Sequence, residues 1–359
     1  MNTRSLLLLA AAALAWPAAA QVKINPGPER IGVVIDGQPF TEFFVAGPTI
    51  AKPYLHPLRA PSGTYVTRMW PMEKVAEEAG IAKPDHQHQR GLWFAHEKVN
   101  GLDFWNNEAS YTTPNRGKIV LAKLDETSSG KDRGVIAATF DWTDLAGNKL
   151  LTESRRMTFY ADPKLRMVDF DITLTAAAAA VTFGDAKDGA FGIRMRPVLQ
   201  EAGGTGHITN ADGLAGEKQL WGKPSNWCDY SGEVNGENVG ITILDHPENP
   251  GHPVRWHARG YGLFAANPFA LAAFTGDKAQ DGSLTVAPGR SVRFRYRVII
   301  HEGDVKDAGI AAQWSNYIGA RAEAGFPVAR PQATSFGKSA RSRMRRVNSS
   351  SVMYSSASR

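Results

Sequence analysis

The chain has 359 residues, of which 43% are hydrophobic and 21% charged, which excludes a mostly disordered protein because ample apolar surface is available for burial. The 35 glycines and 21 prolines follow no collagen-like period, and the one cysteine, Cys228, excludes an internal disulfide framework. The net charge is +6, but seven of the 41 basic residues lie in 330–359 and Arg4 lies in 1–20. Residues 21–329 therefore hold 33 basic and 35 acidic residues, so we expect no nucleic-acid binding by the folded body.

Residues 1–20 have the pattern of a signal peptide. Arg4 precedes an apolar run, and small residues at Ala18–Ala20 fit a cleavage site, so the mature chain is expected to begin at Gln21. The alternative is a membrane anchor, but the apolar run is short for a span. We expect a periplasmic or secreted protein with no transmembrane segment after the signal peptide, because no later stretch reaches 18 apolar residues.

Residues 54–105 form the first of two bands rich in histidine, arginine and aromatic residues. Four of the nine histidines fall there, at positions 56, 86, 88 and 96. On an extended strand His86 and His88 would point to the same side, and Arg90 would share it. Two imidazoles and a guanidinium on one face are costly unless they meet a ligand, a metal or an anion.

This pattern leaves three interpretations open. The imidazoles could bind a metal ion, with a third ligand from His56, His96 or a carboxylate. They could act as acid and base toward a sugar, since a histidine near its ordinary pKa of about 6.5 exchanges protons at neutral pH, with Arg59 or Arg90 holding a carboxylate or oxyanion. The third interpretation is a polar strand without a ligand.

Three consecutive stretches alternate between apolar and polar residues, which predicts a half-buried antiparallel meander. They are Gly134–Trp142, Leu150–Tyr160 and Met167–Thr175. Glu153 and Arg155 interrupt an apolar face of the second stretch and are expected to form an internal ion pair.

The second polar and aromatic band covers residues 221–261. Prolines at positions 247, 250 and 253 exclude a regular central strand there and predict a shaped loop. Flat aromatic faces beside carboxylates and basic groups suit sugar rings, whose C–H faces stack while their hydroxyls form hydrogen bonds. The alternative for each tryptophan is a place in the core.

Ser291–His301 alternates again, and its polar face carries Arg293, Arg295 and Arg297, most simply as a solvated strand face. Helix signals are few: a run from Asp304 to about Ala320, and Met72–Ala79 as a short helix or a charged loop. We therefore predict an all-β fold, a large antiparallel β-sandwich with few helices. Residues 21–325 are expected to form a single domain, and the Ser- and Arg-rich residues 326–359 a disordered basic tail.

At the two bands the sequence resembles a set of exported bacterial proteins of unassigned activity known under the label "methane oxygenase PmoA". The resemblance covers roughly residues 30–305 and rests on four segments in order. They are KPYLHPLRAPSG (Lys52–Gly63), DHQHQRGLWFAH–VNGLDFW (Asp85–Trp105), WGKPSNWCDY (Trp221–Tyr230) and DHPENPGHPVRWHARGYGLFAANPF (Asp245–Phe269).

One segment departs from that family. Its stretch before Arg90 usually looks like Asp-His-Pro-His-His, whereas Gln87 and Gln89 stand here in place of the proline and the last histidine. The label itself is physically misleading, because a particulate methane monooxygenase subunit is a multi-helix membrane protein and this chain has no spanning segment after its signal peptide. The resemblance implies a secreted β-sandwich similar to carbohydrate-active sandwich enzymes, of which a mutarotase-like supersandwich is one form.

We therefore expect a periplasmic carbohydrate-active protein, an enzyme that cleaves or isomerises a glycoside by acid/base chemistry. The expected catalytic residues are His86, His88, His56, Arg59 and Arg90. The expected substrate-binding residues are Tyr54, Trp93, His96, Trp227, Asp229, Tyr230, His246 and His257. No cofactor is expected in this interpretation. The alternatives are a non-catalytic sugar-binding protein and metal-dependent oxidation with His86, His88 and His56 as ligands; the oligomeric state is not predicted.

Overall fold

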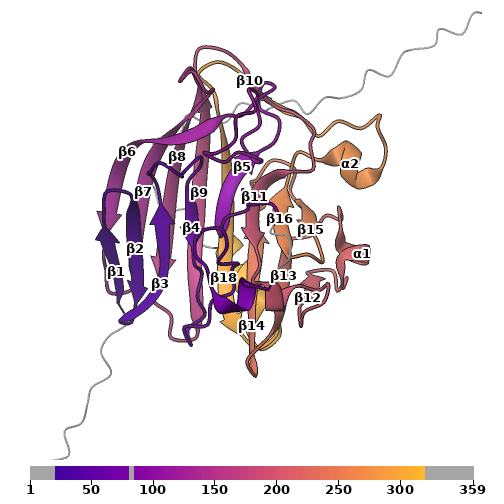
Figure 1. Ribbon diagram of the computed structural model, residues 1–359. Helices are drawn as coiled ribbons and strands as arrows, with labels where there is room; N and C mark the ends of the chain where they lie inside the picture. The colour runs from indigo at the N-terminus through magenta and orange to yellow at the C-terminus, as the bar shows by residue number, and fades with distance from the viewer. Residues whose placement is uncertain (1–20, 81–84, 320–359) are drawn as a thin grey trace, which may run out of the picture. The chain divides into compact units, whose positions relative to one another are not determined.

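The computed structural model describes residues 21–80 and 85–319, which form two large antiparallel sheets packed face to face (Figure 1). This confirms the predicted all-β sandwich. The expected signal peptide in residues 1–20 and the expected tail in residues 326–359 lie outside the described residues, so both stay predictions. Within the described residues, no helix combines the length and the apolar character that crossing a membrane requires.

The first sheet, called sheet A, has eight strands in the order β1-β2-β3-β4-β5-β11-β16-β15. Its strands are β1 (Val22–Pro26), β2 (Arg30–Ile35), β3 (Gln38–Phe44), β4 (Tyr54–His56), β5 (Leu92–His96), β11 (Gly189–Arg194), β15 (Arg255–Ala258) and β16 (Leu263–Asn267).

The second, called sheet B, also has eight strands, in the order β12-β13-β14-β18-β9-β8-β7-β6. Its strands are β6 (Lys118–Ser128), β7 (Arg133–Thr143), β8 (Lys149–Tyr160), β9 (Leu165–Ala176), β12 (His207–Asn210), β13 (Trp227–Val234), β14 (Glu237–Asp245) and β18 (Ser291–Glu302). The remaining elements are short: β10 (Val181–Phe183) pairs with β17 (Leu284–Val286), and the helices are η1 (Ala76–Glu78), η2 (Pro197–Leu199), α1 (Glu217–Leu220), α2 (Leu271–Thr275) and α3 (Ile310–Gly319).

The core lies between the two sheets, where alternating side chains of both sheets meet. Phe170 of β9 and Tyr296 of β18 contact Phe191 of β11, with ring centroids 4.8 and 4.6 Å apart. All three rings are buried, and each contributes about 1.5–3 kcal/mol by leaving water. The predicted meander is confirmed as β7, β8 and β9, and so is the internal ion pair, with Arg155 Nε 2.6 Å from Glu153 Oε1.

The outer face of sheet B differs from the prediction in two ways. The arginines of β18 are not a solvated row: Arg295 and Arg297 are each 9% exposed, and Arg293 and Arg297 pair with aspartates of β9. The helix expected from Asp304 begins only at Ile310, because residues 304–309 form turns.

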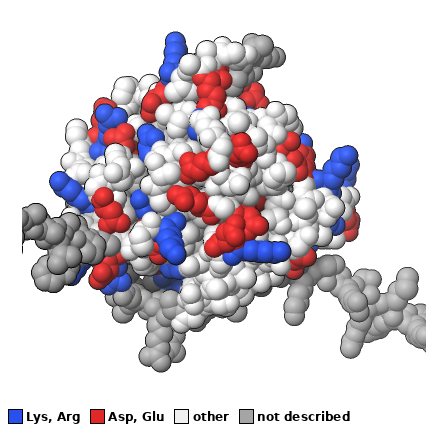
Figure 2. Space-filling model, turned by 90° about the horizontal axis from the view of Figure 1, so that it is seen from below, with Lys and Arg blue, Asp and Glu red and all other residues white. Residues whose placement is uncertain are grey.

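Between Met72 and Ala79 only the 3₁₀ turn η1 forms. Elsewhere charged residues of both signs are interspersed, as on the face in Figure 2.

Candidate functional site

The candidate site is built on the outer face of sheet A. Tyr54 pairs with Trp93 across β4 and β5, and Trp93 pairs with Gly192 across β5 and β11. Since partners in register point to the same side of a sheet, these residues share the outer face, together with His56 and Arg194 at alternate positions of their strands. All of these positions are buried. The sequence therefore gathers aromatic and basic side chains on a face that is covered by loops.

A glycine makes room for two indole rings on this face. A Cβ at Gly192 would lie 2.7 Å from the Trp105 ring and 3.0 Å from the Trp93 ring. The two indoles contact each other, with centroids 4.8 Å apart, and both are fully buried. Neither indole N–H finds a hydrogen-bond partner within the described residues. Buried donors without a partner are rare and costly, so these two indoles are an unusual feature of this face.

The His86 side chain is held by two neighbours, Asp85 and Tyr261, at the loop that covers this face. Its Nδ1 lies 2.6 Å from Asp85 Oδ2, and its ring stacks on Tyr261 with centroids 5.5 Å apart and planes 7° apart. Asp85 is fixed in turn by Arg194 at 3.0 Å and Arg68 at 3.4 Å. Burial alone would raise the pKa of Asp85, but Arg194, His86 and Arg68 together hold this pKa below its ordinary value. The carboxylate is thus charged and positioned to orient the imidazole.

The predicted strand through His86 and His88 is wrong, because the chain makes a turn there and His86 has a φ of 48°. The turn still brings the two rings together, with centroids 5.6 Å apart. Their environments differ: the His86 side chain is 42% exposed, whereas His88 is buried and its Nε2 has no partner within the described residues. Burial, then the charges of Lys52 and His86, lower the pKa of His88 to about 2. The expectation of an ordinary pKa fails for His88, which is a neutral imidazole at neutral pH.

His56 lies on β4 and is fully buried beside Glu73, with Nε2 3.6 Å from Oε1. Burial and the nearby Arg59 and Arg90 lower the pKa of His56 to about 3. The Arg59 guanidinium itself donates to the carbonyl oxygen of Gly63 at 3.3 Å. His56 is therefore a second neutral imidazole of this face.

Two more cations lie close to the histidines. Arg90 donates to Glu108 through Nε at 2.8 Å and Nη2 at 2.5 Å, and its guanidinium lies over the Tyr54 ring. Lys52 Nζ donates to the carbonyl oxygen of Trp105 at 2.9 Å, and burial lowers its pKa to about 7. We call the following residues the histidine–arginine cluster: Lys52, Arg68, Asp85, His86, His88, Arg90, Glu108, Arg194 and Tyr261. Its three arginines outnumber its two carboxylates, so the cluster favours an anionic group.

Two predicted binding residues, His96 and His257, are not part of the histidine–arginine cluster. His96 points into the sandwich, where its ring packs 4.7 Å from the Phe269 ring and its Nε2 lies 2.7 Å from the Gly184 carbonyl oxygen. His257 lies on the outer face of sheet A, further along on β15, and its Nδ1 is 3.7 Å from Asp188 Oδ1. Burial lowers the pKa of His257 to about 4.

Four other predicted binding residues do not join the cluster, so the expectation of one shared pocket is wrong for Trp227, Asp229, Tyr230 and His246. Trp227, Asp229 and Tyr230 belong to β13 of sheet B. Trp227 packs under α3 on the outer face of that sheet. Asp229 Oδ2 is 2.9 Å from Nε2 of the buried His301. His246 also lies on the sheet B side, 2.9 Å from Arg295 Nη2.

Tyr230 faces inward instead, and its hydroxyl accepts from the backbone N–H of Glu201 at 2.7 Å. Of the second band, Tyr261 reaches the cluster, because the hairpin between β15 and β16 belongs to sheet A.

The alternative metal site has no support from the donor set. Across residues 21–80 and 85–319, no group of three or more His, Cys, Asp and Glu side chains is arranged to hold a metal ion. His56, His86 and His88 therefore do not converge as a ligand set. Cys228 is buried, and burial raises the pKa of its thiol, which makes it a poor nucleophile.

Sequence reasoning missed the residues that position His86. Asp85 directly precedes His86 and is the first residue of the segment Asp85–Trp105 on which the family resemblance rests, so the sequence did contain a signal for it. Arg68 and Arg194 gave no signal, because they lie 17 and 109 residues from Asp85 and meet it only in the folded chain.

The chain belongs to a family of unknown function (DUF6807), whose model matches residues 30–315. No curated protein matches the sequence. Similar solved structures include a galactose mutarotase related enzyme from Lactobacillus acidophilus, with 8% identity, 79% of this chain and 97% of that chain covered, and a TM-score of 0.35. Another is a galactose mutarotase-like protein from Clostridium acetobutylicum, with 11% identity, 79% and 98% covered, and a TM-score of 0.37. The resemblance to proteins labelled methane oxygenase stays a prediction.

Proposed function

We propose that the chain is a carbohydrate-active enzyme that binds an acidic sugar at the histidine–arginine cluster and transfers a proton through His86, cleaving or isomerising a glycoside. The observation that carries the proposal is the pairing of His86 with Asp85, itself fixed by two buried arginines. A carboxylate on Nδ1 stabilises the tautomer and the orientation in which Nε2 takes up and returns a proton.

The surroundings of His86 suit a sugar with a carboxylate. Arg194 and Arg68 supply positive charge beside Asp85 and the backbone of His86. His88, as a neutral imidazole, can donate or accept a hydrogen bond without adding charge. Rings such as Tyr261 offer flat faces to the C–H groups of a sugar.

The proposed step begins at the carbon next to the substrate carboxylate. Nε2 of His86 takes the proton from this carbon, and the electron pair of the broken C–H bond moves onto the carboxylate, where the arginines stabilise the added negative charge. If the oxygen substituent on the neighbouring carbon then leaves with the electron pair of its bond, a C=C bond forms and the glycoside is cleaved. If a proton returns to the opposite face of the carbon, the sugar is isomerised.

The test is a turnover screen on acidic polysaccharides and oligosaccharides, read by ultraviolet absorbance of a new double bond and by proton NMR of the sugar. We expect His86→Gln to lower kcat by about 10²–10⁴-fold, a typical contribution of a positioned acid or base, with little change in KM. His207→Gln is the matched control, because His207 is an exposed histidine on β12 of sheet B.

Unchanged kcat in His86→Gln would remove His86 from the mechanism. Binding of acidic sugars without turnover of any of them would contradict the enzymatic proposal and leave a sugar-binding protein.

A further inference from the structure

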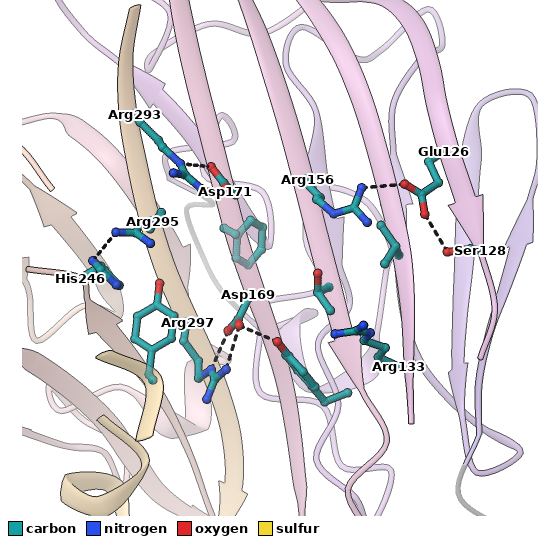
Figure 3. A pocket seen from close by; sticks show the side chains of 15 residues that line it. Glu126, Ser128, Arg133, Arg156, Asp169, Asp171, His246, Arg293, Arg295 and Arg297 are labelled. Atoms are coloured by element: carbon teal, nitrogen blue, oxygen red, sulfur yellow. Dashed lines mark hydrogen bonds and ion pairs between the residues drawn. The ribbon is translucent and has the colours of Figure 1, made fainter. Parts of the chain in front are cut away.

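A second concave region lies on the outer face of sheet B, across the sandwich from the histidine–arginine cluster. It is a cavity of about 590 Å³, which is within the size range of small-molecule sites (Figure 3). Its wall is formed by strands β6, β7, β8, β9 and β18, by His246 after β14 and by Tyr317 of α3. None of its lining residues belongs to the histidine–arginine cluster, so a ligand bound here would be a second one.

The charged side chains of the lining are paired. Four arginines each meet a carboxylate: Arg156 with Glu126, Arg293 with Asp171, Arg297 with Asp169, and Arg295 with Glu248 from outside the lining. Arg133, the fifth arginine of the lining, has an interaction of its own. His246 adds no charge at neutral pH, since burial and Arg295 lower its pKa to about 4. The four pairs cancel, so they favour neither an anion nor a cation.

Two neighbouring pairs leave room for a hydroxyl group between them. Arg156 and Asp171 are partners in register across β8 and β9, so their side chains lie next to each other on one face. Each is bonded away from the other: Arg156 Nη1 donates to Glu126 at 2.6 Å, and Asp171 Oδ1 accepts from Arg293 Nε at 2.7 Å (Figure 3). Within the described residues Arg156 and Asp171 form no ion pair with each other.

Both side chains can be reached by a ligand, because each is 31% exposed. Arg156 keeps further N–H donors, and the Asp171 carboxylate keeps further lone pairs. A single hydroxyl group can accept from the guanidinium and donate to the carboxylate at the same time. It would do so without displacing either side chain from its present partner, whereas an ion would compete with a partner of its own sign.

The next row of the sheet places polar groups beside an apolar one. Thr158 is in register with Asp169 on one side and with Val135 on the other, and all three line the cavity. Within the described residues the Thr158 hydroxyl forms no hydrogen bond, so it can still donate and accept. Val135 adds an apolar side chain to the wall. A sugar ring presents hydroxyls and C–H groups together, which matches this combination.

We infer that this cavity is a second ligand site, which binds an uncharged saccharide of one or two rings. One sugar hydroxyl would bridge Arg156 and Asp171, a second would meet Thr158, and C–H groups of the ring would contact Val135. The inference does not depend on His86 or on any reaction at the histidine–arginine cluster.

The test measures binding to the full mature chain by isothermal titration calorimetry. Cellobiose, maltose and galactobiose are the neutral probes, which differ in linkage and in the direction of their hydroxyls, and digalacturonate is the charged probe. We expect at least one neutral probe to bind and to keep its affinity when the salt concentration is raised, because salt screens charges and not the hydrogen bonds of hydroxyls.

The variants test the bridging hydroxyl. Arg156→Ala and Asp171→Ala should each weaken the binding of that neutral probe about tenfold, since each removes a hydrogen bond to a charged group. The double variant should bind about as weakly as either single variant, because the same hydroxyl loses its place in all three. Asp141→Ala is the matched control: Asp141 pairs with Lys149 at 3.3 Å across β7 and β8 and is 29% exposed, but it does not line the cavity.

Absence of binding by all three neutral probes would overturn the inference, and so would equal losses in Asp171→Ala and Asp141→Ala. Binding of digalacturonate alone, lost in Arg156→Ala, would show a site for anions and also overturn it. Neutral binding that is lost in His86→Gln but kept in both cavity variants would place the ligand at the histidine–arginine cluster instead. Melting temperatures of all variants exclude unfolding as the cause, and either cavity variant alone suffices if the other does not fold.

Discussion

The outer faces of both sheets carry arginines and histidines, but the surroundings of these residues differ between the two sheets. On sheet A, the histidine–arginine cluster combines buried guanidiniums with neutral imidazoles and with indole donors that lack partners. On sheet B, the arginines of β18 face carboxylates across the strands, and a cavity opens between them. Buried polar groups without hydrogen-bond partners are costly and are retained where catalysis needs them. Charges that are paired across neighbouring strands suit ligand binding instead. This difference supports our proposal that proton transfer takes place on sheet A.

The largest expected effect concerns pH and the neutral imidazoles of sheet A. His56 and His88 have pKa values lowered to about 3 and about 2, while the unfolded chain binds these protons near pH 6.5. Unfolding therefore takes up protons below pH 6.5, and stability falls as the pH is lowered from there toward the folded values. Each histidine costs up to about 1.4 kcal/mol per pH unit.

Urea unfolding at pH 7.5, 6 and 5 measures this effect. His88→Gln should reduce the acid slope by the share of one histidine, about a fifth, because His56, His96, His246 and His257 also have lowered pKa values. His207→Gln should leave the slope unchanged. An acid slope that is the same in His88→Gln and in the parent would show that His88 is not buried as a neutral group.

The next largest effect is the loss of stability when one carboxylate is removed from the outer face of each sheet. Asp85→Ala leaves the guanidiniums of Arg68 and Arg194, each 3% exposed, without their carboxylate. Asp85 is itself 47% exposed, so its loss is expected to cost about 1–3 kcal/mol, the penalty for leaving buried guanidinium donors without a partner. Asp171→Ala is the counterpart on sheet B, where Arg293 is 32% exposed and the pair contributes about 1 kcal/mol or less. Chemical denaturation of both variants should rank them in this order, and equal losses would contradict the difference between the faces.

A smaller effect tests the fit of the indoles on sheet A. Gly192→Ala places a methyl group against Trp105 and Trp93, and overpacking of this kind costs about 1–3 kcal/mol. Gly80→Ala is the control, because a Cβ there meets no atom of the described residues within 4 Å. Unfolding free energies and the tryptophan emission spectrum report the change. A Gly192→Ala protein as stable as Gly80→Ala would mean that the indole pair is loosely packed.

The sequence predicts the strands well and the assignment of residues to faces poorly, for physical reasons. Period-two alternation over ten or more residues defines β8, β9 and β18, because one face of each is apolar. The same alternation cannot tell a solvated arginine row from arginines paired with a neighbouring strand, because the partner aspartates lie more than 120 residues away.

The candidate site was predicted in part. The histidines were found because they are dense in a short segment, although a turn rather than a strand brings them together. The second band is divided between the two sheets. Trp227 lies in β13 of sheet B, whereas Tyr261 lies in the hairpin between β15 and β16 of sheet A, although the two are close in sequence. Local sequence carries no information on which sheet a strand joins.

The smallest expected effect is a dependence of stability on pH that is opposite in sign to that of His88. It comes from His301 of sheet B. Burial alone would lower the pKa of His301, but its bond to Asp229 Oδ2 at 2.9 Å raises this pKa above its ordinary value. The protonated imidazole therefore stabilises the folded chain fully below about pH 6.5, the ordinary value in the unfolded chain, and this contribution is lost as the pH rises through the raised value. His301→Gln should thus lose more stability at pH 6 than at pH 9 relative to the parent, whereas His88→Gln should gain relative stability on acidification. Urea unfolding of the two variants at both pH values checks the signs, and parallel behaviour would contradict the contrast between the two faces.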